Sequence, residues 1–417
     1  MKKLTPSAWE KEYIVGPVER FDRKNTGPSR LIWDDSMDPS IKKLLKDIPA
    51  DGAINPDHPG LTVMERAMRT VSRSTIRMID LFNVSKPNLN PASKAIMDAM
   101  SNAGVLPPKP TEGAKIDIGD PQKITRAIKK VATHFGADLV GICKLDRRWV
   151  YSHTYNDVPK AATSESTELD MSRHKRQEIP DEFQYAIVMA VGGDYDMRRY
   201  FPTYISAADL SNSGVRGILA NIRLTAFIQN LGFKVIDCTW DDVGLAIPMA
   251  MQAGLGQIGR NGLLITPQFG PTVRIGQVLT DLPLIPDAPI DFGVTEFCRA
   301  CKKCADMCPS NSIPHGERTA EPTSISNASG ELKWQCNPIS CRDRFAHTKH
   351  PCQICISCCP FNKPDTWFHR TVRWFVDKAR WSDSFYVKMD NLFGYGKPKK
   401  ADNFWEEWQP GKGRKIS

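Results

Sequence analysis

The sequence of 417 residues predicts a mixed α/β or α+β core followed by a module built around cysteines. Between residues 120 and 282, stretches with helical spacing of apolar residues alternate with short apolar runs that are typical of buried strands. After them, ten of the twelve cysteines lie between Cys298 and Cys359. The chain is long enough for two or three domains, and its hydrophobic content of 41% is ordinary for a globular protein.

The elements of the core follow one another along the chain. Apolar residues at 124–135 recur at helical spacing, and the run 138–143 indicates a buried strand. A second strand is predicted at 185–191, and then a helix at 217–231 that ends before Gly232, where a helix C-cap belongs. The last predicted elements are a strand at 234–238, a helix at 247–253 and a strand at 273–282.

We expect four parts in the chain. Residues 1–115 are rich in Pro, Asn, Asp and Lys, and we interpret them as a wrapping segment that ends near a linker at 107–110. Residues 116–290 are expected to form the core, and residues 291–363 the cysteine-rich module. Residues 364–417 contain many aromatic and basic side chains and are predicted to be a tail packed over the rest.

Charge and hydropathy exclude some function classes. The net charge of +9 is spread along the chain without a dense basic stripe, so nucleic-acid binding is not predicted. No run of about 18 apolar residues is present, and the first residues lack the apolar segment of an export signal. As written, the sequence predicts a cytoplasmic protein. The alternative is an exported, membrane-associated mature form from which a signal has been removed.

The first cysteine motif is Cys298, Cys301, Cys304 and Cys308, followed by Pro309, with the spacing C-x2-C-x2-C-x3-C-P. Two-residue gaps let three thiolates converge on one [4Fe–4S] cluster, and in proteins with two such clusters the fourth cysteine binds the other cluster. Disulfides would be spread through the fold, and a structural zinc site is the remaining alternative. The motif therefore predicts iron–sulfur clusters that transfer electrons.

The second cysteine motif occupies 352–359 and ends before a proline, as the first motif does. Because the matching proline follows Cys359, this cysteine is the expected crossing ligand. The second cluster needs one more cysteine from upstream, Cys341 or Cys336, and we favour Cys341, which leaves Cys336 and Cys358 as packing residues. The expected ligands are Cys298, Cys301, Cys304 and Cys359 for one cluster, and Cys308, Cys341, Cys352 and Cys355 for the other.

A glycine-rich run, IPMAMQAGLGQIGRNGLLITPQFGPTVR at 247–274, comes before the cysteines. This run, the segment ERFDRKNT at 19–26 and the order of core before two cluster motifs resemble corrinoid-dependent reductive dehalogenases. The resemblance covers nearly the whole chain from about residue 17. It implies a nitroreductase-like corrinoid-binding core followed by a ferredoxin-like module with two [4Fe–4S] clusters. The glycine-rich run is also similar to epoxyqueuosine reductases.

The resemblance also implies site residues. The family pairs a tyrosine proton donor with a basic residue that lowers the tyrosine pKa. Arg274 falls at the basic position and Asp241 at a polar position of the active site. Residues 213–215 occupy the place expected for the tyrosine, so Tyr204 is the nearest candidate donor. The residues implied to bind the corrinoid are Gly254, Gly256, Gly259, Arg260, Asn261, Gly262 and Thr266.

The activity implied by the resemblance is an oxidoreductase that cleaves a carbon–halogen bond of a small organohalide. Electrons would pass from a low-potential donor through the clusters to a cobalamin, and a membrane anchor protein would be a partner of an exported form. A homodimer is a candidate assembly. An epoxyqueuosine reductase-like corrinoid enzyme is the alternative enzyme, and a two-cluster electron carrier is the alternative without catalysis.

Overall fold

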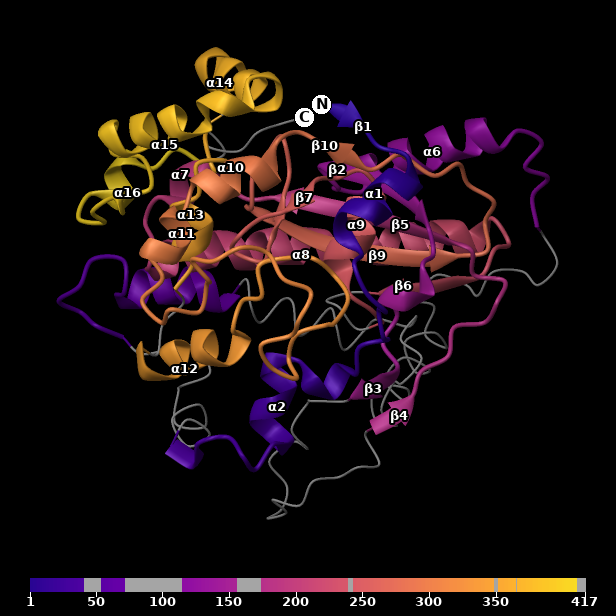
Figure 1. The fold of residues 1–417 in the computed structure, drawn as a ribbon, viewed down its shortest axis with the longest axis horizontal. Coiled ribbons are helices and arrows are strands. Elements are labelled where there is room, and N and C mark those ends of the chain that lie inside the picture. The colour runs from indigo at the N-terminus through magenta and orange to yellow at the C-terminus, as the bar shows by residue number, and fades with distance from the viewer. Residues whose placement is uncertain are drawn as a thin grey trace.

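A four-stranded antiparallel sheet forms the centre of the fold in the computed structural model (Figure 1). The structure describes residues 1–40, 54–71, 115–155, 174–238, 243–348, 352–364 and 366–410. Because all three strand pairings are antiparallel, the core belongs to the α+β class rather than the α/β class. In sheet order, the strands are β2 (Leu139–Lys144), β5 (Tyr185–Gly192), β9 (Val273–Thr280) and β6 (Val235–Cys238).

Helices cover both faces of this sheet. Successive side chains of a strand point to opposite faces, so Ile187 of β5 packs toward one helical layer and Val188 toward the other. One layer consists of α6 (Pro121–His134) and α8 (Tyr204–Asn230), and the other of α9 (Ala246–Gln252) and α1 (Pro6–Tyr13).

The predicted elements of the core are confirmed, with one difference in length. The helix predicted to begin at residue 217 begins at Tyr204, where the Thr203 hydroxyl caps it by accepting from the backbone N–H of Ile205 at 3.2 Å. Gly214 and Gly217 therefore lie inside this helix. A helix tolerates interior glycines at a cost of about 1 kcal/mol each, and here they face β9 across a narrow space.

The described residues of the N-terminal part pack on the core and beside it. Its α1 places Trp9 and Tyr13 in the core, where both are at most 2% exposed. The predicted linker at 107–110 lies outside the described residues. The wrapping elements and the hairpin beside them are β1 (Lys2–Lys3), which pairs with β10 (Ile290–Asp291), η1 (Arg23–Asn25), α2 (Gly27–Trp33), β3 (His153–Tyr155) and β4 (His174–Arg176).

The cysteine-rich segment lies at one end of the sheet, and the C-terminal helices lie beyond it (Figure 1). No helix among the described residues is both long and apolar enough to span a bilayer. The elements here are α7 (Tyr195–Arg198), β7 (Gln257–Ile258), β8 (Leu264–Ile265), α10 (Val294–Ala300), α11 (Lys303–Asp306), α12 (Pro338–Thr348), α13 (Ile354–Ser357), α14 (Trp367–Lys378), α15 (Asp383–Leu392) and α16 (Phe404–Glu407).

Candidate functional site

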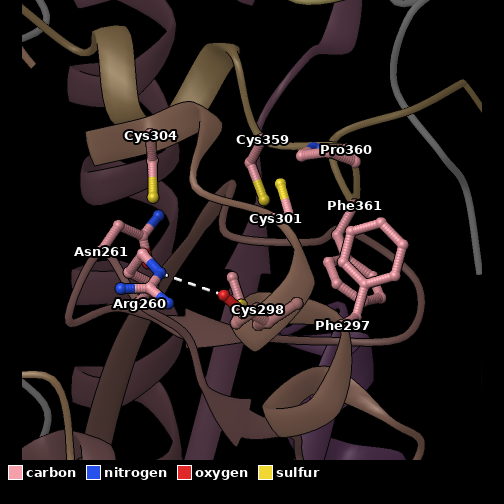
Figure 2. Close-up of a pocket in the computed structure, with 10 residues that line it drawn as sticks. Arg260, Asn261, Phe297, Cys298, Cys301, Cys304, Cys359, Pro360 and Phe361 are labelled. Carbon is pink, nitrogen blue, oxygen red and sulfur yellow. Dashed lines mark hydrogen bonds between the residues drawn. The ribbon is translucent and has the colours of Figure 1, made fainter. Parts of the chain in front are cut away.

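Four cysteines from two distant segments line one buried cavity (Figure 2). Three of them come from the loop around α10 and α11, where the backbone N–H of Cys301 donates to the Phe297 carbonyl at 2.8 Å and turns the chain. The fourth follows α13. Their exposed fractions are 8% for Cys298, 5% for Cys301, 9% for Cys304 and 7% for Cys359. This is the set that the sequence assigns to one cluster, and the fold brings it together.

Burial controls the protonation of these thiols. Desolvation raises the pKa of Cys301 to about 11 and that of Cys359 to about 12, and it raises the pKa values of Cys298 and Cys304 further. Four such thiols keep their protons at neutral pH unless a cation compensates the charge. Iron ions provide that charge and favour soft sulfur ligands, so the donor set fits an iron–sulfur cluster.

Arg260 and Asn261 line the same cavity, although the family resemblance implies that they bind the corrinoid. The Arg260 guanidinium donates from Nε to the Cys298 carbonyl at 3.0 Å (Figure 2). It also donates from Nη1 to the Pro314 carbonyl at 2.7 Å. Its buried Nη2 has no hydrogen-bond partner among the described residues. Asn261 donates to the Cys355 carbonyl at 3.2 Å. Both side chains therefore hold the cysteine loops, and the spare Arg260 donor suits an anionic cluster.

A second group of thiols includes Cys341, which lies on α12 and is exposed. After burial, the charges of Cys352 and Cys308 are among the causes that raise the Cys341 pKa, so these thiols lie within electrostatic range of Cys341. Cys355 also belongs to the group. Burial raises its pKa most, the charge of Cys358 comes next, and the charges of Cys341 and Cys352 follow. These four cysteines are the set expected for the other cluster.

The two cysteines expected to be packing residues differ in their surroundings. Cys358 is fully buried and packs with Cys304 and Ala305. Cys336 is partly buried and its thiol donates to the Arg260 carbonyl at 3.4 Å. Desolvation, and then the charge of Cys341, raise the pKa of Cys336 to about 12. Cys336 therefore borders the second group.

A buried Lys–Asp–Lys bridge beside the first cavity has no counterpart among the residues singled out from the sequence. The Asp390 carboxylate accepts from Lys303 Nζ and from Lys363 Nζ, each at 2.6 Å. Lys303 directly precedes Cys304, and Lys363 follows Cys359 by four positions. With both lysines protonated, the three side chains carry a net charge of +1 next to the cavity, which favours an anionic group there, although burial lowers the Lys363 pKa. Asp390 belongs to α15, and nothing in the sequence pairs that helix with the cysteines.

Close contacts within the chain account for the glycine-rich run. A Cβ at Gly256 would lie 2.0 Å from the Ile265 carbonyl oxygen, and one at Gly254, whose φ is +74°, would lie 2.5 Å from the Ala288 carbonyl oxygen. Thr266 is buried and its hydroxyl accepts from the backbone N–H of Phe269, closing a turn. Similar contacts involve Ile265 at Gly259 and Cys336 at Gly262. At these positions the backbone packs closely against neighbouring segments. Their geometry does not by itself indicate a corrinoid.

Arg274 lies on β9 and faces α8. It lines a cavity together with Gly214, Gly217 and Gly276. Residues 213–215, which occupy the place expected for the tyrosine, are inside α8, and Gly214 among them borders this cavity. Asp241, the predicted polar residue of the active site, lies outside the described residues.

Tyr204 is not brought together with Arg274. It is the first residue of α8, ten positions before Gly214, which corresponds to about 15 Å along a helix. The Tyr204 ring is buried under the Arg69 guanidinium, 5.4 Å from the ring centroid, and its backbone N–H donates to the Gly60 carbonyl at 2.9 Å. In the sequence, Gly214 and Gly217 indicate a helix boundary. For this reason Tyr204 was expected in a loop before the helix.

A buried ion pair connects the core to the second cysteine motif. Arg198 of α7 is 1% exposed and pairs with Asp209 of α8 at 2.6 Å. The same guanidinium donates to the side-chain carbonyl of Gln353, which directly follows Cys352. This contact fixes the cysteine loop to the end of the sheet.

Comparisons with known proteins place the chain in a family. No protein-family model matches it. It is 34% identical over 322 residues to the tetrachloroethene reductive dehalogenase of Sulfurospirillum multivorans, a match that covers 74% of this chain and 64% of the relative. It is 36% identical over 311 residues to the enzyme of the same name from Dehalobacter restrictus, covering 67% of this chain and 55% of that relative.

A solved structure agrees with the sequence relatives. The structure described as "Reductive dehalogenase structure suggests a mechanism for B12-dependent dehalogenation" matches with a TM-score of 0.70 and 21% identity, and the match covers 97% of this chain and 50% of that one. The chain thus spans between half and two thirds of the length of these three proteins. At this level of identity over most of the chain, and with the same mixed helix-and-sheet fold, the chain belongs to the reductive dehalogenase family.

Proposed function

We propose that this chain acts as a reductive dehalogenase on a small organohalide. In such a reaction two electrons and one proton replace the halogen by hydrogen and release halide. The observation that carries the proposal is the buried four-cysteine cavity in a chain related to two tetrachloroethene reductive dehalogenases (Figure 2).

Two [4Fe–4S] clusters are proposed as the electron path. Cys298, Cys301, Cys304 and Cys359 would hold one cluster, and Cys308, Cys341, Cys352 and Cys355 the other. Support comes from the sulfur donors of the first cavity, from the spare donor of Arg260 and from the positive charge of the Lys–Asp–Lys bridge. Clusters that exchange ligands in this way are neighbours, so electrons can pass between them.

A cobalamin is proposed as the second cofactor, on the basis of the family. The solved structure that matches this chain is described as suggesting a mechanism for B12-dependent dehalogenation by that protein. When bound, the cobalamin supplies the strongly reducing metal centre that cleaves the carbon–halogen bond. The proposed core is nitroreductase-like and occupies 116–290, between the wrapping segment at 1–115 and the ferredoxin-like module at 291–363, with the tail at 364–417.

The proposed role of Arg274 is electrostatic. Its guanidinium favours the ionised form of an adjacent proton donor, which makes the proton easier to give up. Asp241, three positions beyond the end of β6, stays the proposed polar partner. Tyr204 does not share the Arg274 cavity, so it is a weaker candidate donor than the sequence suggests. The proposed external partners are a low-potential electron donor and, for an exported form, a membrane anchor protein.

The test measures metals and activity on protein produced anaerobically with corrinoid supplied. We expect about eight irons and one cobalt per chain, and chloride release from tetrachloroethene with a strong chemical reductant. Cys298→Ala should lower the iron content, and Cys143→Ala, a buried cysteine outside the module, should not. Eight irons without cobalt would indicate an electron carrier. Both metals with activity on an epoxyqueuosine-modified tRNA, and none on organohalides, would indicate the alternative enzyme.

A further inference from the structure

A group of metal-ligating side chains lies far from the cysteines. Asp22, His153 and His174 each offer one ligand atom, and these atoms all lie within 4.8 Å of one another. They come from the start of η1 and from both strands of the β3–β4 hairpin. In Figure 1 this hairpin lies at the lower side of the molecule, well separated from α11 and α13.

The spacing of the three ligand atoms suits a metal ion. Asp22 Oδ2 lies 2.8 Å from His174 Nε2 and 3.7 Å from His153 Nδ1. Ligand atoms about 2.0–2.1 Å from a tetrahedral zinc ion are roughly 3.3–3.5 Å apart, which is between these two values. The two imidazole rings are stacked, with centroids 4.4 Å apart and planes at 20°, so both present a nitrogen toward the same carboxylate.

The hairpin register explains why the two histidines meet. Tyr155 pairs with His174 and His153 pairs with Arg176 across the antiparallel ladder. His153 and His174 are therefore diagonal neighbours on the same face of the hairpin, which is within reach of long side chains.

The carboxylate is held in place by its own backbone. Asp22 Oδ1 accepts from the backbone N–H of Lys24 at 3.0 Å and caps η1, which leaves Oδ2 directed at the histidines. The Asp22 and His174 side chains are 18% and 14% exposed, and the His153 side chain is 37% exposed. The group is thus mostly shielded, with one side open to water.

The cationic neighbours are engaged elsewhere. Arg20 donates to the carbonyls of Tyr151 and Gln177, each at 2.6 Å, and Arg23 donates to the carbonyl of Tyr155. These bonds hold the N-terminal arm against the base of the hairpin, so the three ligand atoms come from segments already fixed relative to one another.

We propose that Asp22, His153 and His174 bind a divalent transition metal such as Zn²⁺. Two imidazoles and one carboxylate are a common protein ligand set for such ions, and water completes the coordination. The ion joins the N-terminal arm to the β3–β4 hairpin. Because metal ligands must lose their protons, binding weakens at acidic pH. The hairpin that carries the two histidines lies away from α11 and α13, which carry cluster cysteines.

The test uses the cluster-loaded protein, so that its cysteines are occupied, and Zn²⁺ as the probe. Both the parent protein and the His153→Ala/His174→Ala variant are first dialysed against chelator and then given Zn²⁺. The parent should take up one zinc more than the variant. Asp22→Asn keeps a good helix cap but removes the charge, and zinc affinity should fall at least tenfold. The control His58→Ala/His134→Ala removes two exposed histidines and should bind zinc like the parent.

X-ray absorption at the zinc edge identifies the ligands. The proposal expects nitrogen and oxygen neighbours at about 2.0–2.1 Å with imidazole scattering, whereas zinc on cysteines would show sulfur at about 2.3 Å. Hydrogen exchange should also slow at 18–25 and 150–155 on zinc addition. Equal zinc uptake by the parent and the double variant, or a sulfur shell alone, would show that the three side chains are only hydrogen-bonded and would overturn the proposal.

Discussion

Cys341 and Cys336 differ in their exposure and in their contacts, since Cys341 is exposed and Cys336 is partly buried. Cys341 is on α12 and its pKa responds to the charges of Cys352 and Cys308. The Cys336 thiol donates a hydrogen bond to the Arg260 carbonyl and packs against Gly262. A thiol with a backbone partner loses that bond on becoming a ligand, so the contacts favour Cys341, in agreement with the spacing of the sequence.

Iron content distinguishes the two cysteines. We expect Cys341→Ala to lose one cluster, so that iron falls from about eight to about four atoms per chain, because a [4Fe–4S] cluster needs four protein ligands. Cys336→Ala is the matched control and should retain about eight. The opposite pattern would make Cys336 the ligand. Electron paramagnetic resonance of the reduced protein would report the loss of the interaction between two neighbouring clusters.

At this scale the meeting of the first four cysteines in one cavity was predictable, their role as cluster ligands stays a prediction, and their supporting residues were not predictable. Short gaps such as that between Cys298 and Cys301 restrict which thiols can meet, so spacing is informative. Arg260 was assigned to a corrinoid from the family resemblance, but its partners are carbonyls more than thirty positions away. Such long-range contacts leave no local signal in the sequence.

The packing of α15 on α10 creates an unusual carboxyl group. Asp383 begins α15, is 3% exposed, and its Oδ1 has no hydrogen-bond partner among the described residues. Desolvation, and then the charge of Glu296 on α10, raise its pKa to about 7, while Arg380 opposes the shift. The folded state thus keeps a proton that the unfolded chain releases near pH 4.

This shift makes the stability of the loaded protein depend on pH. Because the folded-state pKa is raised, the free energy of unfolding should fall as pH rises from about 4 to 7. Asp383→Asn removes the ionisation, so it should stabilise the fold by up to about 4 kcal/mol at pH 8 and by less at pH 5.5. Anaerobic thermal unfolding at both pH values measures this. The exposed Asp181→Asn is the control, and a gain equal at both pH values would contradict the shift.

The elements themselves were largely predictable because their periodicity is local. Strand β5 is an apolar run, and α6 repeats its apolar residues at helical spacing. The start of α8 was not predictable. Glycines are usual at helix ends, but Gly214 and Gly217 lie inside this helix, opposite Gly276 of the sheet. Strand direction was also left open, since alternation of helices and strands does not determine it.

For the molecule as a whole, Arg198 connects the core to the cysteine module. Its guanidinium pairs with Asp209 in the core and reaches Gln353 in the module. Replacement by methionine leaves the Asp209 carboxylate buried without its cation, which costs about 3–5 kcal/mol for a buried pair. The bridge between the two parts is lost at the same time.

We expect Arg198→Met to lower both stability and cluster retention. Thermal unfolding of the loaded protein should occur at a lower temperature, and iron should be lost faster on exposure to chelator because the loop at Cys352 is released. Arg199→Met changes the neighbouring, exposed arginine and should alter the free energy of unfolding by no more than about 0.5 kcal/mol. Equal behaviour of the two variants would show that the bridge contributes little.

The N-terminal arm has a consequence for synthesis of the chain. The Tyr13 hydroxyl contacts the Thr295 hydroxyl, 282 positions later, and β1 pairs with a strand just before it. At about 5–20 residues per second, the ribosome needs roughly 15–60 s to make the intervening chain. During that interval Tyr13 lacks its native partner from α10, so this end of the arm can dock completely only after the cysteine-rich loops have emerged.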